Sequence, residues 1–390
     1  MTTEIGTGHG FFPQYEPKQD LLRAFCRENE VPESAPKLPS PWPASAATMT
    51  WTAQDLTNSH ITHISEAQRV EIAAACNAYR ESGKSLDGLN KASFPLPLLA
   101  DKLTETRRDL HHGPGISILR GVDPSSLSMR EIFITFAGLA SHVSQQRGQQ
   151  SGGKAIVHIT DLADTGRTAL PAPYRNSPLP FHTDPAADVI AMFVIQASAN
   201  GGHGIFCPVA SIYNELVTTR PDLLSELAKP DWPFDRPPDG VGDFYRRPVM
   251  FLGDVSAAPE MVFSRGALIR SPQGFRPSNI PLLTRRQGAA LDALHFTAAS
   301  LAYRVEYQKG DVLFFNNRRI LHGREAFQDD GNGKRHLLRL WLRDEELAGT
   351  PPPPLDKVWE GGFAAGDEAS IEARNEAEDA ARWPLVPNGC

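Results

Sequence analysis

The chain of 390 residues carries a formal net charge of −7, with 41% hydrophobic and 22% charged residues. These values are typical of a soluble globular protein that is long enough to bury a sizeable core. An acidic balance without a clustered basic patch argues against nucleic acid as a partner. The longest apolar run, residues 189–197, is far shorter than the roughly 20 residues that a helix needs to cross a bilayer.

The cysteines and the N-terminus indicate the compartment. The four cysteines are scattered and form no C-x-x-C pair, which favours a reducing compartment over a disulfide framework or a zinc ribbon. The first 20 residues lack a basic segment followed by an apolar one, so no secretory signal is predicted. We therefore expect a cytoplasmic protein that binds a small molecule and has neither a membrane nor a nucleic acid as partner. The sequence leaves the oligomeric state open.

The N-terminal part of the chain is predicted to be mostly helical after an irregular start. Residues 1–50 are rich in proline, serine and charge, which predicts an irregular arm. Apolar residues at helical spacing predict a helix over residues 66–79, with Ser65 as its N-cap, and a second helix over residues 98–110. We expect residues 51–112 to form a helical flank that packs on the core rather than folding alone.

The rest of the chain is predicted to be mainly β with flanking helices. An apolar run between glycines predicts a buried strand within residues 113–121. After a polar, glycine-rich segment at 144–154, which is either a lid or a flexible loop, short apolar runs alternate with Gly, Pro, Asn and Asp. This pattern over residues 113–350 predicts a sandwich or barrel, of which the double-sheet jelly roll is one form. Residues 351–390 are expected to form a C-terminal tail. Further helices are expected at 129–143, from about Ser211, and at 283–299.

A histidine and an aspartate alternate in the segment LPFHTDPAADV, at His182 and Asp184. In a strand, residues i and i+2 point to the same side, so the two side chains can face one point. A further histidine, His322, follows in the segment GDVLFFNNRRILHG. Two histidines and one carboxylate on one face of an octahedral ion are the ligand set of non-haem Fe(II) oxygenases. An H-x-D spacing alone is weak, and His182 could equally be a hydrogen-bonded strand residue beside an Asp-Pro turn.

The segment KRHLLRLWLR alternates strictly, with Arg335 and Arg339 on one side and leucines on the other. The leucine side must be buried. The arginine side either lies in water, as in an ordinary amphipathic strand, or points into a barrel. An inward arginine is costly unless it meets an anion, and a guanidinium fork suits a carboxylate. Arg335 is therefore a candidate for binding the distal carboxylate of 2-oxoglutarate.

Four motifs together resemble the taurine dioxygenase (TauD/TfdA) family of Fe(II)/2-oxoglutarate oxygenases. They occur in this order: FHTD, GGHGIFCPVASIYNEL, GDVLFFNNRRILHGREAF and RHLLRLWLRDEEL. The resemblance implies a double-stranded β-helix, a jelly-roll or cupin-like core, and an enzyme that uses Fe(II), 2-oxoglutarate and O2. It also implies that His182, Asp184 and His322 bind the iron and that Arg335 binds 2-oxoglutarate. Arg339 matches a family arginine that binds an anionic group of the substrate or co-substrate.

One position departs from the family pattern. After the glycine pair the family often has Asp-Thr, and the threonine hydroxyl assists the 2-oxoglutarate carboxylate, whereas here the residues are His203 and Gly204. Gly204 has no side chain, so that hydrogen bond must come from elsewhere or be missing. His203 is one substitute, although a histidine in such a turn is more often merely solvated.

Several residues near the motifs are candidates for the substrate pocket. They are His158, Phe181, Thr183 and Phe206. For each the alternative is a structural role: His158 is about as often a satisfied core histidine, and apolar residues that flank motif strands are usually core. Asn316 and Asn317 are expected to shape a turn rather than to touch substrate.

The predicted function is oxidation of an unactivated C–H bond in a small, anionic molecule such as an amino acid or a related carboxylate. The outcome is hydroxylation, desaturation or oxidative ring closure, and the family branch favours secondary metabolism. Fold does not fix the substrate. Two alternatives stay open at this point. One is a non-catalytic jelly-roll protein that binds a carboxylate or metal, and the other is a zinc hydrolase with the same His-Asp-His ligands.

Overall fold

The computed structural model describes most of the chain, and all structural statements below concern these parts. They are residues 14–31, 45–56, 58–144, 146–150, 153–165, 170–235, 241–252, 258–269, 276–330, 333–353 and 355–363. No helix within these ranges has both the length and the hydrophobicity needed to cross a bilayer.

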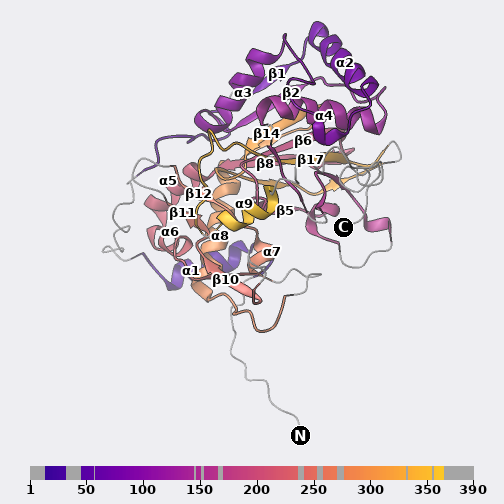
Figure 1. Cartoon of the computed structure of the whole chain (residues 1–390). Helices are drawn as coiled ribbons and strands as arrows, with labels where there is room; N and C mark the ends of the chain where they lie inside the picture. The colour runs from indigo at the N-terminus through magenta and orange to yellow at the C-terminus, as the bar shows by residue number, and fades with distance from the viewer. Residues whose placement is uncertain are drawn as a thin grey trace.

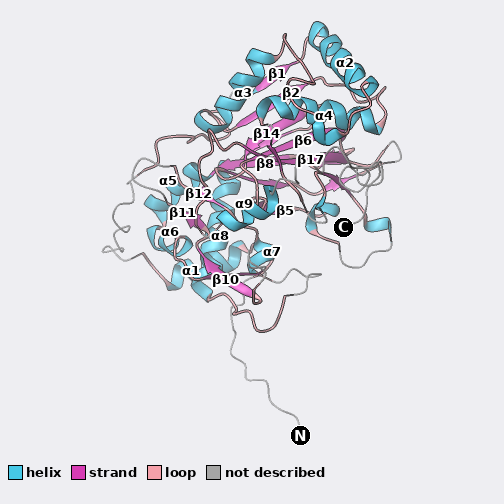
Figure 2. Cartoon of the chain, in the orientation of Figure 1, coloured by secondary structure: helices cyan, strands magenta, loops and turns pink. Residues whose placement is uncertain are grey.

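Two β-sheets form the centre of the molecule, and helices cover both outer sides (Figures 1 and 2). The larger sheet has the strand order β1-β2-β14-β6-β17-β3, and β4 also pairs with β17. Its strands are β1 (Ile61–His63), β2 (Ile116–Arg120), β3 (Gln146–Arg147), β4 (Ile156–Thr160), β6 (Val189–Gln196), β14 (Val312–Asn316) and β17 (His336–Arg343). The smaller sheet has the order β13-β8-β15-β5. Its strands are β5 (Leu179–His182), β8 (Gly204–Pro208), β13 (Tyr303–Val305) and β15 (Ile320–Arg324). This pair of sheets is the predicted jelly-roll core.

Short ribbons and helices complete the fold. Three two-stranded ribbons pair β7 (Asn200–Gly201) with β16 (Phe327–Gln328), β9 (Trp232–Asp235) with β10 (Phe244–Arg247), and β11 (Met250–Phe251) with β12 (Glu260–Met261). The helices are α1 (Gln19–Glu28), α2 (Glu66–Glu81), α3 (Ala100–His112), α4 (Met129–Val143), α5 (Val209–Thr219), α6 (Pro221–Leu227), α7 (Arg265–Leu268), α8 (Arg285–Leu301) and α9 (Asp356–Phe363).

Three apolar clusters correspond to the layers of the molecule. One lies between the larger sheet and the helices α2, α3 and α4, and it joins Leu103 of α3 to Phe193 of β6. A second packs α1, α5, α6 and α8 on the outer face of the smaller sheet. The third lies between the two sheets and includes Phe315 of β14 and Phe206 of β8. Burial of apolar surface is the dominant favourable term in folding, so these clusters fix both sheets in place.

Helices α2 and α4 begin where the sequence predicts. Ser65 caps α2 with a capping box, in which its hydroxyl accepts from the Gln68 backbone and Gln68 returns the bond. The same device begins α4 at Ser128. Since α2 and α3 share one apolar cluster with the larger sheet, we propose that residues 51–112 and 113–350 form one folding unit, with the first as a flank.

Both ends of the chain contain more structure than predicted. Residues 1–50 were expected to be an irregular arm, yet α1 forms within them and buries Phe25 against α8. Residues 351–390 were expected to be a tail, yet α9 buries Trp359, whose indole Nε1 donates to Asp188 Oδ1 (3.1 Å). In both segments one or two large apolar side chains anchor a short helix. So few apolar residues give too weak a periodic pattern to predict a helix in an otherwise polar sequence.

Strand β17 lies inside the larger sheet, between β6 on one side and β3 and β4 on the other, and it is buried on both faces. Its leucines Leu338 and Leu340 pack toward the helices, as expected for the leucine side of the alternation. The opposite side carries Leu337 and Trp341 into the space between the sheets. The arginine side of the alternation therefore points into the fold and not into water.

Candidate active site

Asp184 lies in a turn that directly follows β5. The strand ends at His182, so the two side chains do not converge through the pleat of a strand, as the sequence reasoning assumed. Asn317 fixes the turn instead: its Oδ1 accepts from Asp184 N (2.8 Å) and its Nδ2 donates to Asp184 O (2.9 Å). The prediction that Asn317 shapes a turn is confirmed, and the turn is the one that aims the carboxylate.

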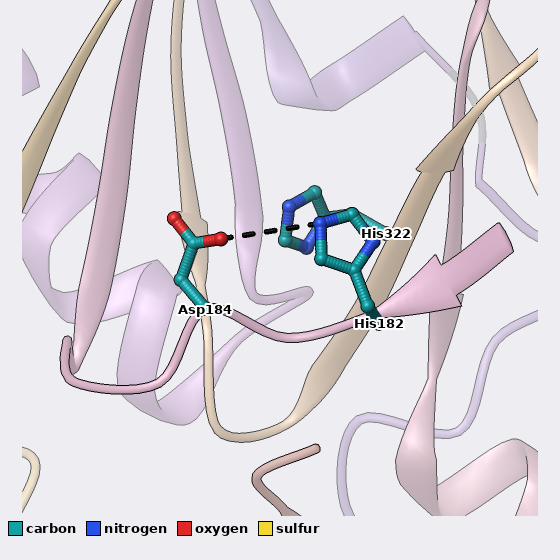
Figure 3. A group of neighbouring side chains, drawn as sticks. All are labelled: His182, Asp184 and His322. Carbon is teal, nitrogen blue, oxygen red and sulfur yellow. Dashed lines mark ion pairs between the residues drawn. The ribbon is translucent and has the colours of Figure 1, made fainter. Parts of the chain in front are cut away.

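His322 comes from the neighbouring strand β15 and faces the same point. It stands opposite His182 in the antiparallel pairing of β15 with β5. The two imidazole rings are 4.1 Å apart between centroids. One ligand atom from each of His182, Asp184 and His322 lies within 4.8 Å of the other two. Figure 3 shows the three side chains converging from the strand end, the turn and the second strand.

The protonation of the two histidines suits a cation. Burial lowers the pKa of His182, and it lowers that of His322 well below 6.5. Both rings are therefore neutral at physiological pH, which is the form that binds metal. The Nδ1 atom of His322 is buried and has no hydrogen-bond partner among the described residues. A buried polar atom without a partner lowers the free energy of unfolding unless a ligand binds it.

Two side chains of β17 hold the Asp184 carboxylate, which is only 4% exposed. The indole Nε1 of Trp341 donates to Asp184 Oδ2 (2.6 Å), and Arg339 Nη1 lies 3.0 Å from the same oxygen. Gln150 orients the arginine, since its Oε1 accepts from Arg339 Nε (2.8 Å). The segment 144–154 therefore contacts the site through Gln150.

Arg335 presents a second positive charge beside the space between the sheets. Its side chain is 2% exposed, and its Nη1 has no hydrogen-bond partner among the described residues. Its guanidinium lies against the rings of Phe327 (5.2 Å) and Tyr307 (5.8 Å). Burial lowers the pKa of Arg335 to about 10, so the group still carries its charge at neutral pH. A buried, charged donor without a partner is an anion site by its chemistry.

These residues fit an iron ion and a dicarboxylate. Two neutral imidazoles and one carboxylate are the donors of a 2-His-1-carboxylate centre, which leaves other positions of the metal open. The geometry alone does not select iron over zinc, because both ions accept these ligands. A zinc hydrolase site would not explain the buried Arg335 side chain, whose Nη1 has no hydrogen-bond partner among the described residues.

The proposed pocket residues divide into two groups. His158 lies on the face of the larger sheet that is turned away from the triad, where its ring contacts Phe133 and its Nδ1 is 2.8 Å from Nε2 of His336. Phe181 also faces away, into the helix cluster around α8. The structure therefore does not bring these two residues to the triad. Their strands were identified correctly, but the face was not.

The other two candidates lie on the triad side or support it. Thr183 is buried between the two ligands of the H-x-D motif, and its hydroxyl accepts from Phe263 N (2.8 Å). It therefore anchors the turn to a neighbouring segment. Phe206 stands opposite His322 in the pairing of β8 with β15, inside the fold. Of the four pocket candidates, Phe206 is the one placed to line the site.

His203 does not replace the family threonine. Its Nδ1 lies 3.0 Å from Glu325 Oε2, and Arg304 bonds to the same carboxylate, on the outer side of the smaller sheet. The position of His203 therefore agrees better with the alternative, a solvated histidine in a turn. The sequence reasoning also missed Gln150, because a polar residue in a glycine-rich loop carries no periodic or motif signal.

Comparisons with known proteins place the chain in a family. Residues 81–341 match the model of the Taurine catabolism dioxygenase TauD, TfdA family. A taurine hydroxylase-like protein of Stachybotrys chartarum is 32% identical over 321 residues, which cover 79% of this chain and 82% of that protein. The FR-33289 synthase of Streptomyces rubellomurinus is 25% identical over 295 residues, covering 72% and 84% of the two chains.

Solved structures share the fold. An asparagine oxygenase in complex with Fe(II), 3-hydroxyasparagine and succinate superimposes with a TM-score of 0.57 at 18% identity, covering 78% of this chain and 98% of that one. The non-heme iron oxygenase OrfP, in complex with Fe and alpha-ketoglutaric acid, superimposes with a TM-score of 0.53 at 17% identity, covering 72% and 93%.

Fold and family together define a non-haem iron oxygenase. The chain belongs to the TauD/TfdA family. It is an Fe(II)/2-oxoglutarate-dependent dioxygenase, with Fe(II), 2-oxoglutarate and O2 as its cofactor and co-substrates. This excludes the non-catalytic and zinc hydrolase alternatives that the sequence alone left open.

Proposed function

We propose that His182, Asp184 and His322 hold the iron and that Arg335 binds the distal carboxylate of 2-oxoglutarate. The observation that carries this assignment is the mutual approach of the three ligand atoms within 4.8 Å, together with a nearby buried guanidinium that has an unpaired nitrogen. Bound iron, 2-oxoglutarate and O2 supply the oxidation of a C–H bond. The protein supplies orientation and a pocket from which water is excluded.

Each residue around the iron ligands has a definable task in this proposal. Burial keeps His182 and His322 unprotonated. Asn317 holds the turn of Asp184 from the backbone side, and Trp341 fixes one carboxylate oxygen. Outer groups of this kind orient metal ligands and commonly change metal affinity by about 10–100-fold when removed.

We propose a small anionic substrate, with an amino acid or a related carboxylate as the class. Arg339 supports an anion because it brings a positive charge to the edge of the triad, and its fork matches carboxylate geometry. The relatives support the amino-acid class: one solved neighbour is bound to 3-hydroxyasparagine and another to (3S)-hydroxy-L-Arg. A phosphonate or sulfonate has the same anionic chemistry and belongs in the same screen.

Hydroxylation is the outcome that we propose first, because the ligands in those two neighbours are hydroxylated amino acids. Desaturation and oxidative ring closure use the same site and differ in product mass. A hydroxylated product gains one oxygen atom, whereas a desaturated or cyclised product loses two hydrogen atoms. Mass spectrometry of the product therefore decides among the outcomes. A role in secondary metabolism is part of the proposal and depends on the substrate found.

The test begins with anaerobic, Fe(II)-loaded protein to which 2-oxoglutarate is added while the visible spectrum is recorded. We expect a weak charge-transfer band that reports chelation of iron by 2-oxoglutarate. Amino acids and other small anions are then screened for a shift of this band. Hits are tested for substrate-dependent formation of succinate in air.

The variant His322→Ala should lose the band, and the matched control His203→Ala should keep it. His203 is a histidine on the neighbouring turn that binds Glu325 and not the site. If His322→Ala retained both the band and substrate-dependent succinate formation, the proposed iron ligands would be wrong.

A further inference from the structure

Gly204 is the first residue of β8, and the space beside it is already filled. A Cβ atom built on Gly204 would lie 2.6 Å from Cζ of Tyr307 and still closer to the Tyr307 hydroxyl. Real Cβ atoms do not approach other atoms so closely, so no side chain fits at position 204 unless Tyr307 moves. A hydroxyl group therefore stands where a larger residue at 204 would place its own side chain.

The register of the smaller sheet explains how Tyr307 reaches this place. In the pairing of β13 with β8, Val305 stands opposite Gly204. Tyr307 follows Val305, the last residue of β13, by two residues, so an extended chain turns both side chains to the same face. That face is the interior one, since Gly204 is also two residues before Phe206, which stands opposite His322.

Tyr307 and Arg335 come together at this point. The Arg335 guanidinium carbon is 5.8 Å from the centre of the Tyr307 ring, and Arg335 Nη1 is buried without a hydrogen-bond partner among the described residues. The Tyr307 hydroxyl is the atom nearest to a Cβ built on Gly204, so it lies on the same interior face. A charged guanidinium nitrogen and a neutral hydroxyl are two donors that match the two oxygens of a carboxylate.

We propose that the Tyr307 hydroxyl donates a hydrogen bond to the distal carboxylate of 2-oxoglutarate, beside Arg335, and that Gly204 is glycine to leave room for it. This inference rests on the proposed role of Arg335. Burial raises the pKa of Tyr307 to about 12, so the hydroxyl keeps its proton at neutral pH and acts as a donor. The hydroxyl that position 204 lacks is thus supplied by the segment that follows β13.

The decisive variant is Tyr307→Phe, which removes one oxygen atom and leaves the ring against Arg335. We expect the dissociation constant of 2-oxoglutarate, measured by titration of the charge-transfer band in anaerobic Fe(II) protein, to rise about tenfold or more, because a hydrogen bond to a charged group is lost. The affinity for Fe(II) alone should not change. The matched control is Tyr303→Phe, at the start of β13, whose ring contacts His60.

A second ligand separates a hydrogen bond from a change in pocket shape. 2-Oxovalerate can chelate iron in the same way but carries a methyl group in place of the distal carboxylate. The wild type and Tyr307→Phe should bind 2-oxovalerate equally well. A loss of affinity of the same size for both ligands would overturn the proposal, because Tyr307 would then act through packing. Equal affinity of both proteins for 2-oxoglutarate would overturn it as well.

Two further variants test the reason for the glycine. Gly204→Ala should weaken 2-oxoglutarate binding, because its Cβ displaces the Tyr307 hydroxyl. The double variant Gly204→Thr with Tyr307→Ala moves the hydroxyl from the segment after β13 to β8, and it should bind 2-oxoglutarate more tightly than Tyr307→Ala alone. If the added threonine gave no gain, the two positions would not share one role. If wild-type protein gave no band with 2-oxoglutarate, the proposed function itself would fail, before any variant was compared.

Discussion

Two pairs of histidines lie on neighbouring strands in this protein, and only one of the two pairs can form a metal centre. His182 and His322 face the space between the two sheets, with ring centroids 4.1 Å apart. His158 and His336 lie on the opposite face of the larger sheet, stacked at 5.0 Å and joined by a 2.8 Å hydrogen bond. Both pairs are removed from water, and burial lowers the pKa of His182, His322 and His336.

The difference between the pairs is the third group. His182 and His322 share a carboxylate, Asp184, which Trp341 holds in place. In the other pair, His158 packs against the ring of Phe133. One nitrogen of each imidazole is used in the hydrogen bond between His158 and His336. A cation needs charge compensation and free lone pairs, so neutral, buried histidines are not sufficient for a metal centre.

The largest expected effect comes from removing the group that distinguishes the two pairs. Asp184→Ala should abolish turnover and the charge-transfer band with 2-oxoglutarate, because the iron loses its anionic ligand. The control is His336→Leu, which disturbs the other pair and should keep both signals. Measurement of iron content after gel filtration and of succinate formation checks this prediction. An active Asp184→Ala enzyme would mean that another carboxylate serves the iron.

The next effect concerns the charge beside that carboxylate. Arg339→Lys keeps a positive charge but loses the fork that reaches both Gln150 and Asp184. We expect kcat/KM for the anionic substrate to fall about 10–100-fold, since hydrogen bonds to charged groups are lost. Steady-state kinetics measure this, and the iron and 2-oxoglutarate band should persist. Loss of the band would instead make Arg339 a positioning residue for Asp184 rather than a contact for substrate.

The sequence predicted the type of fold and the triad better than the surroundings of the triad. Motif residues such as His322 are tied to chemistry and can be recognised along one chain. Which face of a strand meets the site depends on register, and a one-residue difference turns a side chain to the other side. His158 and Phe181 were assigned to the pocket for this reason, although their strands were correct.

Contacts between distant segments escaped the sequence entirely. Gln150 reaches the site from a loop, Trp341 from β17 and Tyr307 from the segment after β13, and these three parts of the chain are far apart in sequence. Gly204 was recognised as a departure from the family pattern, but the side chain that fills its space lies 103 residues later in the chain. No local pattern reports such a pairing.

A pH dependence should follow from the second pair. The pKa of His336 is lowered from 6.5 to about 4, first by burial and then by His158. In the unfolded chain the group binds a proton below pH 6.5, whereas the folded chain resists protonation down to about pH 4. The free energy of unfolding should therefore fall as the pH drops from 6.5 to 4, by at most about 1.4 kcal/mol per pH unit. Denaturant titrations of metal-free protein measure this, and His336→Leu should have a flatter profile. Equal slopes in both proteins would contradict the prediction.

The smallest effect is the stability change of His336→Leu at neutral pH, where the histidine is uncharged. The variant replaces one partner of the His158 hydrogen bond by an apolar group of similar size, so we expect a loss of about 1 kcal/mol in the free energy of unfolding. Urea denaturation at fixed metal content measures it. Affinities for Fe(II) and 2-oxoglutarate should match the wild type, because the sheet separates His336 from the triad. A weaker iron affinity would show that the two pairs are coupled through β17, which carries His336 on one face and Trp341 and Arg339, the partners of Asp184, on the other. The two histidine pairs would then form one connected unit rather than two independent ones.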